Sequence, residues 1–293
     1  MDLIIPTISQ GLLWAVMAIG VYITFRVLDI ADLTVEGSFP LGAATAAALL
    51  TGGHNPITAI VAACFAGMIS GTITGFLHTK LKIPALLAGI LTMIALYSIN
   101  LRIMGKANIS LLQVDTIFTI FPVSFDVQSI VLIVGLIAVS IVGLVSYWFF
   151  GTEIGAAIRA TGFNQHMIRA NGINTDITIM LGLLLSNGLV AISGALVAQN
   201  NGFADVGMGV GTIVIGLASV IIGEVLFGTK SFKNCLISVV LGSIVYRVVI
   251  AVVLQMGMPP NDLKLFTAVL VALALSLPLF QAKLNNRKRR MAK

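Results

Sequence analysis

Long apolar blocks separated by short polar turns run through most of this chain. Each block has about 17–25 residues, the length at which an α-helix crosses a lipid bilayer. The blocks are continuously apolar and lack the alternating pattern of a membrane β-barrel strand. We therefore predict about nine membrane-spanning helices, at residues 8–27, 37–52, 56–78, 83–104, 128–150, 177–199, 209–227, 234–256 and 262–281.

The composition places the chain in the same class. Hydrophobic residues make up 58% of it and charged residues only 10%, which excludes an ordinary soluble domain. We expect a single all-α polytopic membrane domain over residues 1–293, ending in a basic tail at 283–293. The stretch 105–127 is too short and interrupted to span, so it predicts an interfacial turn. No cleavable signal peptide is expected, because Met1-Asp2 lacks a basic start.

Basic residues predict the orientation of these helices. With the C-terminal tail in the cytoplasm, thirteen Lys and Arg residues fall on the inner side and three on the outer side. Short loops with the excess of Lys and Arg normally stay inside. We therefore expect the C-terminus to be cytoplasmic and the N-terminus to lie outside. The basic balance needs no nucleic-acid partner, because the NNRKRR tail is typical of a topology signal attracted to anionic lipid.

A polar segment, residues 151–176, interrupts the apolar blocks near the middle of the chain. Its pattern predicts a short helix over residues 153–161, with Gly162 as its stop. Asn164 can cap a second short helix that Gly172 closes, and Asn174 or Thr175 can then cap the next span. On the cytoplasmic side, a folded segment of this length indicates a surface that presses on another protein.

The exposed part of this segment should present apolar contacts such as Ile158 and Met167, with Arg159 and Arg169 beside them for orientation. The alternative is an amphipathic helix lying on lipid. Such a helix usually carries more Lys and Arg and bulkier apolar residues than this alanine-rich segment provides.

Three acidic residues and a Pro-Gly pattern lie between the first two spans, at residues 28–42. One interpretation is a plain loop in which Asp32 or Thr34 caps the second span. The other is an irregular re-entry at membrane depth, near Glu36, which is tolerated only where protein or a water-filled path covers the backbone.

Two ionisable residues fall within later spans. Glu224 follows a series of glycines (207, 209, 211, 216 and 223) that allow helices to approach closely. It is either a functional group or a residue near the cytoplasmic end that snorkels or pairs with a basic residue such as Arg247. Arg247 should face the protein interior, where a structural ion pair is expected rather than a substrate contact.

Polar side chains recur on the fourth and sixth spans: Thr92, Tyr97, Ser98, Asn100, Ser186, Asn187 and Ser193. Such residues often hold membrane helices together through hydrogen bonds. The alternative is that some of them line a solute pathway.

Catalytic chemistry is not visible in the chain. The three histidines and two cysteines are scattered without metal-ligand spacing, and phosphate-binding or nucleophile motifs do not occur. We expect a non-catalytic protein that binds no cofactor or metal itself. An ATPase-independent secondary transporter or channel is one function class open to it, with Glu36, Glu224 and Arg247 as candidates for ion coupling.

Three motifs carry a family resemblance. DLTVEGSFPLGAATAA, the G-x-x-x-R-A-x-G run of the 151–176 segment, and GMGVGTIVIGLASVIIGEVLFGTKSF occur in that order. Together they resemble permease subunits of ABC importers of the branched-chain amino acid and ribose class. The first motif is most similar to the tryptophan/tyrosine importer branch. The chain departs from the commoner ten-helix pattern by starting outside with nine candidate spans.

The resemblance implies a type II, vitamin-importer-like transmembrane fold in a bacterial cytoplasmic membrane. It implies an importer subunit that works with a second copy of itself, two cytoplasmic ABC ATPases that bind ATP and Mg, and an extracytoplasmic binding (lipo)protein. The solute is small and hydrophilic or amphipathic, with an aromatic or branched-chain amino acid preferred.

Two sets of candidate site residues follow from this resemblance. The ATPase-coupling residues are Ile154, Ile158, Arg159, Thr161, Gly162, Asn164, Met167, Arg169 and Gly172. The candidate pathway residues are Glu36, Gly37, Ser38, Thr92, Met93, Tyr97 and Asn187.

Overall fold

A computed structural model of the protein describes residues 4–120, 126–257, 265–269 and 272. Seven of its helices or helical stretches are long and apolar enough to cross a membrane. They are α1 with its π-helical extension (Ile4–Val27), α3 (Pro56–Thr79), α4 (Ala85–Met104), α5 (Val127–Gly151), α8 (Thr175–Asn201), η2 with α9 (Val206–Phe227) and α10 (Phe232–Gln255). The chain is therefore a multi-pass helical membrane protein, as its apolar blocks predict.

Two of the nine predicted spans are not among these seven. The block 37–52 corresponds to α2 (Val35–Thr51), which is a helix of only 17 residues. Most of the block 262–281, and the whole basic tail 283–293, lie outside the described residues. Seven candidate spans therefore stand in the described part of the chain.

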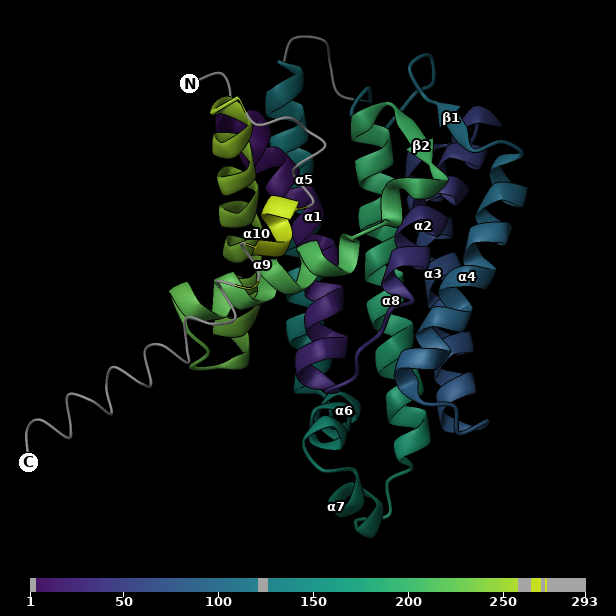
Figure 1. Ribbon diagram of the computed structural model, residues 1–293, viewed down its shortest axis with the longest axis vertical. Coiled ribbons are helices and arrows are strands. Elements are labelled where there is room, and N and C mark those ends of the chain that lie inside the picture. The colour runs from purple at the N-terminus through teal and green to yellow at the C-terminus, as the bar shows by residue number, and fades with distance from the viewer. Residues whose placement is uncertain (1–3, 121–125, 258–264, 270–271, 273–293) are drawn as a thin grey trace, which may run out of the picture.

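The helices form a layered bundle in which α1, α2 and α8 lie in the middle (Figure 1). Helices α3 and α4 cover one side, and α5, α9 and α10 lie on the other. Of the candidate spans, α8 and α1 are the most enclosed: 67% and 61% of an 18-residue apolar stretch in each is buried, against 28% in α4. Small residues make this possible: Ala43, Ala44, Ala46 and Ala47 of α2 are fully buried, so neighbouring backbones approach closely.

Helix α2 begins partway along the bundle instead of at its end. The linker that precedes it brings Asp32 next to Asn187, which lies near the middle of α8. The linker backbone is satisfied locally, since the N–H of Ile30 donates to the carbonyl of Thr24 (2.9 Å) and the N–H of Thr34 donates to Asp32 Oδ1 (2.9 Å). Irregular backbone covered by protein in this way matches the re-entry interpretation of residues 28–42.

A second chain segment enters the bundle from the opposite end. After α8 the chain forms β2 (Phe203–Asp205) and the 3₁₀ turn η2 (Val206–Gly209), then α9 (Thr212–Phe227). Gly209 reaches the first turn of α2, where an added Cβ would lie 2.0 Å from the carbonyl oxygen of Glu36. This contact confirms the predicted close approach at the glycine-rich segment and admits no side chain at position 209.

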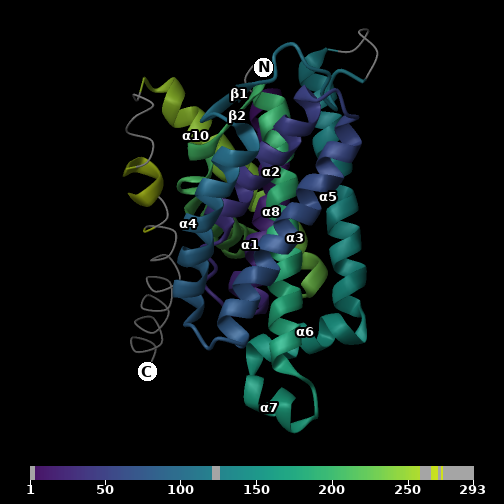
Figure 2. The same cartoon turned by 90° about the vertical axis from the view of Figure 1, so that its right-hand side faces the viewer.

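The expectation of an all-α fold is wrong in one detail. β1 (Asn108–Ser110) pairs antiparallel with β2, with Ile109 opposite Ala204, and forms a two-stranded sheet. It lies within the stretch predicted as an interfacial turn, at the end of the bundle opposite α6 and α7 (Figures 1 and 2). Because the partner strand is almost a hundred residues away in sequence, local pattern gives no signal for it.

Candidate functional site

The polar segment 151–176 forms two short helices that project from one end of the bundle (Figures 1 and 2). They are α6 (Glu153–Phe163) and α7 (Gln165–Ala170). The predicted caps are confirmed at Asn164, whose Oδ1 accepts the N–H of Met167 (3.0 Å), and at Asn174, whose Oδ1 accepts the N–H of Asp176 (2.9 Å). Helix α6 continues through Gly162 to Phe163, so the predicted helix end is two residues too early.

The inner face of α6 anchors the segment to the bundle. Ile158 is fully buried, so its expected role as an exposed contact is wrong. The hydroxyls of Thr161 and Thr178 are hydrogen-bonded at 2.8 Å, and an added Cβ at Gly162 would lie 1.9 Å from the carbonyl oxygen of Val27. The helical repeat places these three residues on the same face, and that face is turned inward. They hold α6 rather than offer it to a partner.

The outer surface of the segment is apolar at its tip. Phe163 is 92% exposed, between the end of α6 and the Asn164 cap of α7. Ile154, Met167 and Ile173 are also exposed. The sequence analysis missed Phe163, although a large aromatic residue between a helix end and an N-cap has little room to turn inward. Exposed apolar side chains on a firmly held polar segment are available for a protein contact.

Arg169 ties α7 to the start of α8 instead of standing free. Its Nε donates to Thr175 Oγ1 (2.5 Å) and its Nη2 lies 3.4 Å from Asp176 Oδ1. Lys80 and Lys82, from the turn between α3 and α4, approach the same carboxylate at 3.3 and 4.0 Å. Because the basic side chains are at least half exposed, each pair contributes little energy, and the network mainly sets the position of α7. Gly172, with φ of +80°, lies in the turn between α7 and α8.

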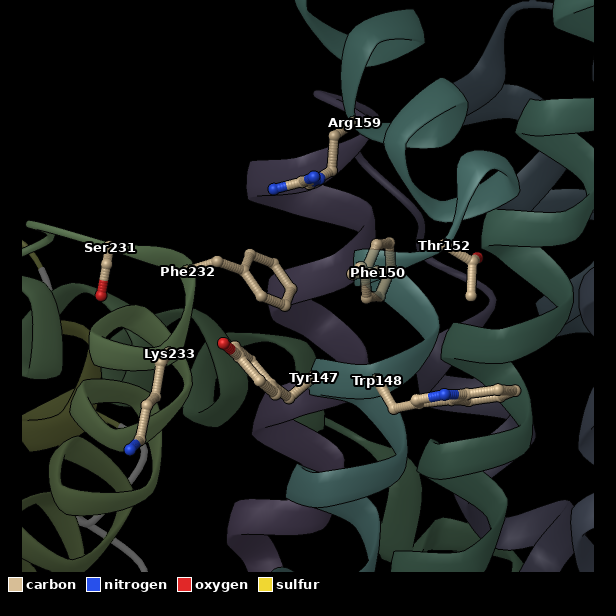
Figure 3. Close-up of a pocket in the computed structure, with 9 residues that line it drawn as sticks. Tyr147, Trp148, Phe150, Thr152, Arg159, Ser231, Phe232 and Lys233 are labelled. Atoms are coloured by element: carbon tan, nitrogen blue, oxygen red, sulfur yellow. The ribbon is translucent and has the colours of Figure 1, made fainter.

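Arg159 faces the start of α10 (Figure 3). Its guanidinium carbon lies 5.5 Å from the ring centre of Phe232, which in turn packs 5.1 Å from Phe150. These residues line a pocket of about 580 Å³, together with Tyr147, Trp148, Gly151, Thr152, Ser231 and Lys233. The packed aromatic rings brace the corner between α5 and α6 against the turn that joins α9 to α10.

Three of the predicted pathway residues lie in an interhelical hydrogen-bond network. The Ser38 hydroxyl donates to Asn187 Oδ1 (2.7 Å), and Asn187 Nδ2 donates to Asp32 Oδ2 (2.8 Å). Thr92 is joined to α3 by the hydroxyl of Thr74 at 2.9 Å. All three are almost fully buried. In this structure they connect α2, α3, α4 and α8, as the helix-joining alternative expects.

Three further polar residues also join helices through hydrogen bonds. Ser186 and Ser193 donate to the carbonyls of Gly20 and Leu13 of α1, at 2.8 Å each, and Asn100 donates to the carbonyl of Gly37 at 3.3 Å.

The other four predicted pathway residues come together in a second pocket, of about 400 Å³, here called the Glu36 pocket. It lies between the start of α2, the middle of α4, the 3₁₀ turn η2 and Val210. Its walls are Glu36, Gly37, Pro40, Met93, Ile94, Tyr97, Ser98, Asn100, Val206, Gly207 and Val210. Glu36 Oε1 accepts the N–H of Gly211 (3.0 Å), which fixes the carboxylate at the pocket wall.

Glu224 pairs with a basic residue, as one interpretation expects, but with Arg26 instead of Arg247. Glu224 forms an ion pair with Arg26, at the end of α1, and Nε of Arg26 donates to both carboxylate oxygens at 2.9 and 3.0 Å. Arg247 stacks over the ring of Trp14, 4.1 Å from its centre. Within the described ranges no acidic side chain pairs with Arg247, so the expected ion pair is not found there.

Among the described residues, no group of three or more His, Cys, Asp or Glu side chains is placed to hold a metal ion.

Comparison with known proteins identifies the family. Residues 3–275 match the family described as branched-chain amino acid transport system, permease component. A tyrosine transport system permease protein of Clostridioides difficile (strain R20291) is 42% identical over 92% of this chain and 88% of its own length. The galactofuranose transporter permease of Escherichia coli (strain K12) is 28% identical over 88% of this chain and 74% of its own length.

A solved structure has a similar fold. It is a metal-chelate type ABC transporter in an inward-facing conformation, with a TM-score of 0.50 and 14% identity over 95% of this chain and 84% of the other. The multi-pass helical bundle, the match over nearly the whole chain and the 42% identical permease agree with one another. The chain belongs to the branched-chain amino acid transport system permease family and is a permease subunit of an ABC transporter.

Proposed function

We propose that this permease is the membrane-spanning part of an ATP-driven importer of the type II fold. Two copies form the path, two cytoplasmic ATPases that carry ATP and Mg drive it, and an extracytoplasmic binding protein delivers the solute. The chain itself performs no catalysis. In this proposal α6 and α7 face the cytoplasm, the β1–β2 sheet faces outward, and the N-terminus lies outside.

The observation that carries the proposal is the construction of the 151–176 segment. A surface element transmits the movement of a partner only if it is held rigidly to the membrane helices. Buried Ile158, the Thr161–Thr178 hydrogen bond and the close contact at Gly162 hold α6 from within. Exposed Phe163 and Met167 remain available on the outside. We therefore assign the ATPase contact to the tip of α6 and to α7.

The proposed solute is an amino acid with an aromatic or branched apolar side chain. The permease of Clostridioides difficile that is 42% identical to this chain is named for tyrosine. The Glu36 pocket supports the same class, because its walls are mainly apolar with a few polar groups.

Replacing Phe163 with Asp tests the ATPase contact. The substitution places a charge at the centre of the proposed apolar contact without entering the bundle, because Phe163 is 92% exposed. We expect the variant to lose co-purification with the ATPase subunit and ATP-driven uptake, since an unpaired charge at an interface costs about 2–5 kcal/mol. The matched control is Leu112→Asp, at a residue 84% exposed near the opposite end of the bundle. Normal ATPase association of Phe163→Asp would move the contact elsewhere.

A further inference from the structure

The Glu36 pocket contains one carboxylate in a largely apolar surrounding. Met93, Ile94, Val206 and Val210 form much of its wall, and Tyr97 adds an aromatic ring. Glu36 is the only acidic or basic residue among the lining residues, all of which are described. The pocket therefore offers a negative charge beside apolar surface.

The Glu36 carboxylate is fixed in position but has no cationic partner. One oxygen accepts the N–H of Gly211 at 3.0 Å. Glu36 is the second residue of α2, at the helix end where the helix dipole favours a negative charge. The ion pairs formed within residues 4–120 and 126–257 do not include Glu36. The carboxylate therefore faces the pocket without a basic partner in the described part of the chain.

Asn100 lies on the pocket wall and has one side-chain atom without a hydrogen-bond partner. It lines the pocket and has no exposed surface. Its Nδ2 donates to the carbonyl of Gly37 at 3.3 Å, while its Oδ1 is buried without any hydrogen-bond partner. The opposite orientation of the amide would place two oxygens against each other, so the unsatisfied atom is the acceptor. Buried acceptors without a protein donor are rare, and an ordered water or a ligand group usually supplies the donor.

We propose that the Glu36 pocket is a solute subsite that binds the ammonium group of an amine or amino acid with an apolar or aromatic body. The proposal rests on the proposed function, in that the solute is the transported one, and it adds the residue that selects the charge. Glu36 receives the ammonium group, the Tyr97 ring offers a cation–π contact, and Met93 and Val210 contact the apolar body. An ammonium group brings three N–H donors and a positive charge, which are the properties that the pocket lacks.

This assignment also predicts what the subsite rejects. A carboxylate without an accompanying ammonium group would face Glu36 with the same charge, and a neutral analogue would leave the Glu36 charge uncompensated. A charge-assisted hydrogen bond is worth about 1.5–3 kcal/mol, so the loss of the ammonium group weakens binding at least about tenfold.

A binding measurement on the full-length permease in lipid nanodiscs tests the subsite. The probe is radiolabelled tyramine in equilibrium dialysis, with unlabelled 3-(4-hydroxyphenyl)propanoate as a competitor that has the same ring but no ammonium group. We expect tyramine to bind wild-type protein and the propanoate to compete poorly. Glu36→Gln keeps an oxygen that accepts the N–H of Gly211 and should weaken tyramine binding at least about tenfold. The control, Asp126→Asn, changes an exposed carboxylate that forms no cap bond and should bind as wild type does.

A second pair of variants does not depend on the folding of Glu36→Gln. Val210→Trp fills the pocket from a residue that is 63% exposed, and Val127→Trp makes the same change at a residue that is 69% exposed elsewhere. We expect only Val210→Trp to abolish tyramine binding. The subsite is overturned if wild-type protein does not bind tyramine, if Glu36→Gln binds it equally well, or if the propanoate competes as strongly as unlabelled tyramine.

ATP-driven uptake by the reconstituted transporter separates this proposal from the proposed function. Uptake that continues in Glu36→Gln with the same preference for ammonium-bearing solutes would overturn the subsite and leave the importer. Charge-dependent tyramine binding without any ATP-driven uptake would overturn the importer and leave the subsite.

Discussion

At the scale of single residues, Ile158 and Phe163 show that two apolar residues on the same short helix, α6, can have different roles. Ile158 is fully buried against the bundle, whereas Phe163 is 92% exposed at the tip. Both are large and apolar, so composition alone does not distinguish them. The difference lies in which side of the helix meets α1 and α8, and it determines what a substitution at each position does.

Replacing Ile158 with Asp should therefore destabilise the protein instead of acting only on its coupling. A carboxyl group placed in this core has no partner, and burying a polar group without a hydrogen bond costs about 2–7 kcal/mol. We expect a lowered melting temperature and poor recovery of folded protein in detergent. Ile154→Asp, at an exposed residue four positions earlier, should melt as wild type does. Equal melting temperatures for the two variants would contradict the buried placement of Ile158.

At the scale of elements, a polar network holds together the helices that meet around the start of α2. Asn187 is its centre, because it accepts from Ser38 and donates to Asp32 and to the carbonyl of Leu183. In a membrane protein such bonds substitute for the hydrophobic effect, which does not act between helices within lipid. The network fixes the re-entrant linker and with it the position of Glu36.

Asn187→Leu should weaken this junction. The substitution leaves Asp32 and Ser38 buried with lost partners, and each unsatisfied group costs about 1–3 kcal/mol, with a larger cost for a charged one. We expect a lower melting temperature and faster proteolysis. Ser98→Ala, at an exposed residue of α4, serves as the control. Unchanged stability together with a loss of uptake in Asn187→Leu would instead indicate that Asn187 lines the solute pathway.

At the scale of the whole molecule, polar features gather at the two ends of the bundle. The β1–β2 sheet lies at one end, and α6, α7 and the Lys80, Lys82 and Arg169 side chains around Asp176 lie at the other (Figure 2). Basic side chains at the α6–α7 end agree with the rule that they stay in the cytoplasm. The Glu36 pocket lies between the ends, where two irregular segments meet.

Cysteine labelling tests this orientation. In a background with Cys64 and Cys235 replaced by Ala, Leu112→Cys should react in intact cells with a membrane-impermeant maleimide. Phe163→Cys should react only after the membrane is opened. Both side chains are exposed at opposite ends of the bundle, so accessibility within the protein does not limit either reaction. The reverse pattern of labelling would invert the proposed topology.

Features that depend on neighbouring residues could be predicted from the sequence. Apolar blocks of bilayer length define the candidate spans because every backbone polar group in lipid must bond within its own helix. The N-caps at Asn164 and Asn174 could be predicted because each side chain accepts a hydrogen bond from an N–H only two or three residues further along the chain. The motif order likewise identified the permease family. Four of the seven predicted pathway residues meet in one pocket, since they lie at the helix start and the helix face that the pattern singled out.

Features that depend on residues far apart in sequence become visible only in the folded molecule. Arg26 and Glu224 are 198 positions apart, so the ion pair could not be chosen over a pair with Arg247 from pattern alone. The pairing of β1 with β2, the inward turn of Ile158 and the burial of Ser38, Thr92 and Asn187 have the same cause. In a chain where most residues are apolar, hydropathy does not say which face of a helix meets protein and which meets lipid. Packing of small residues and interhelical hydrogen bonds make that choice, and they become visible only when the helices are assembled.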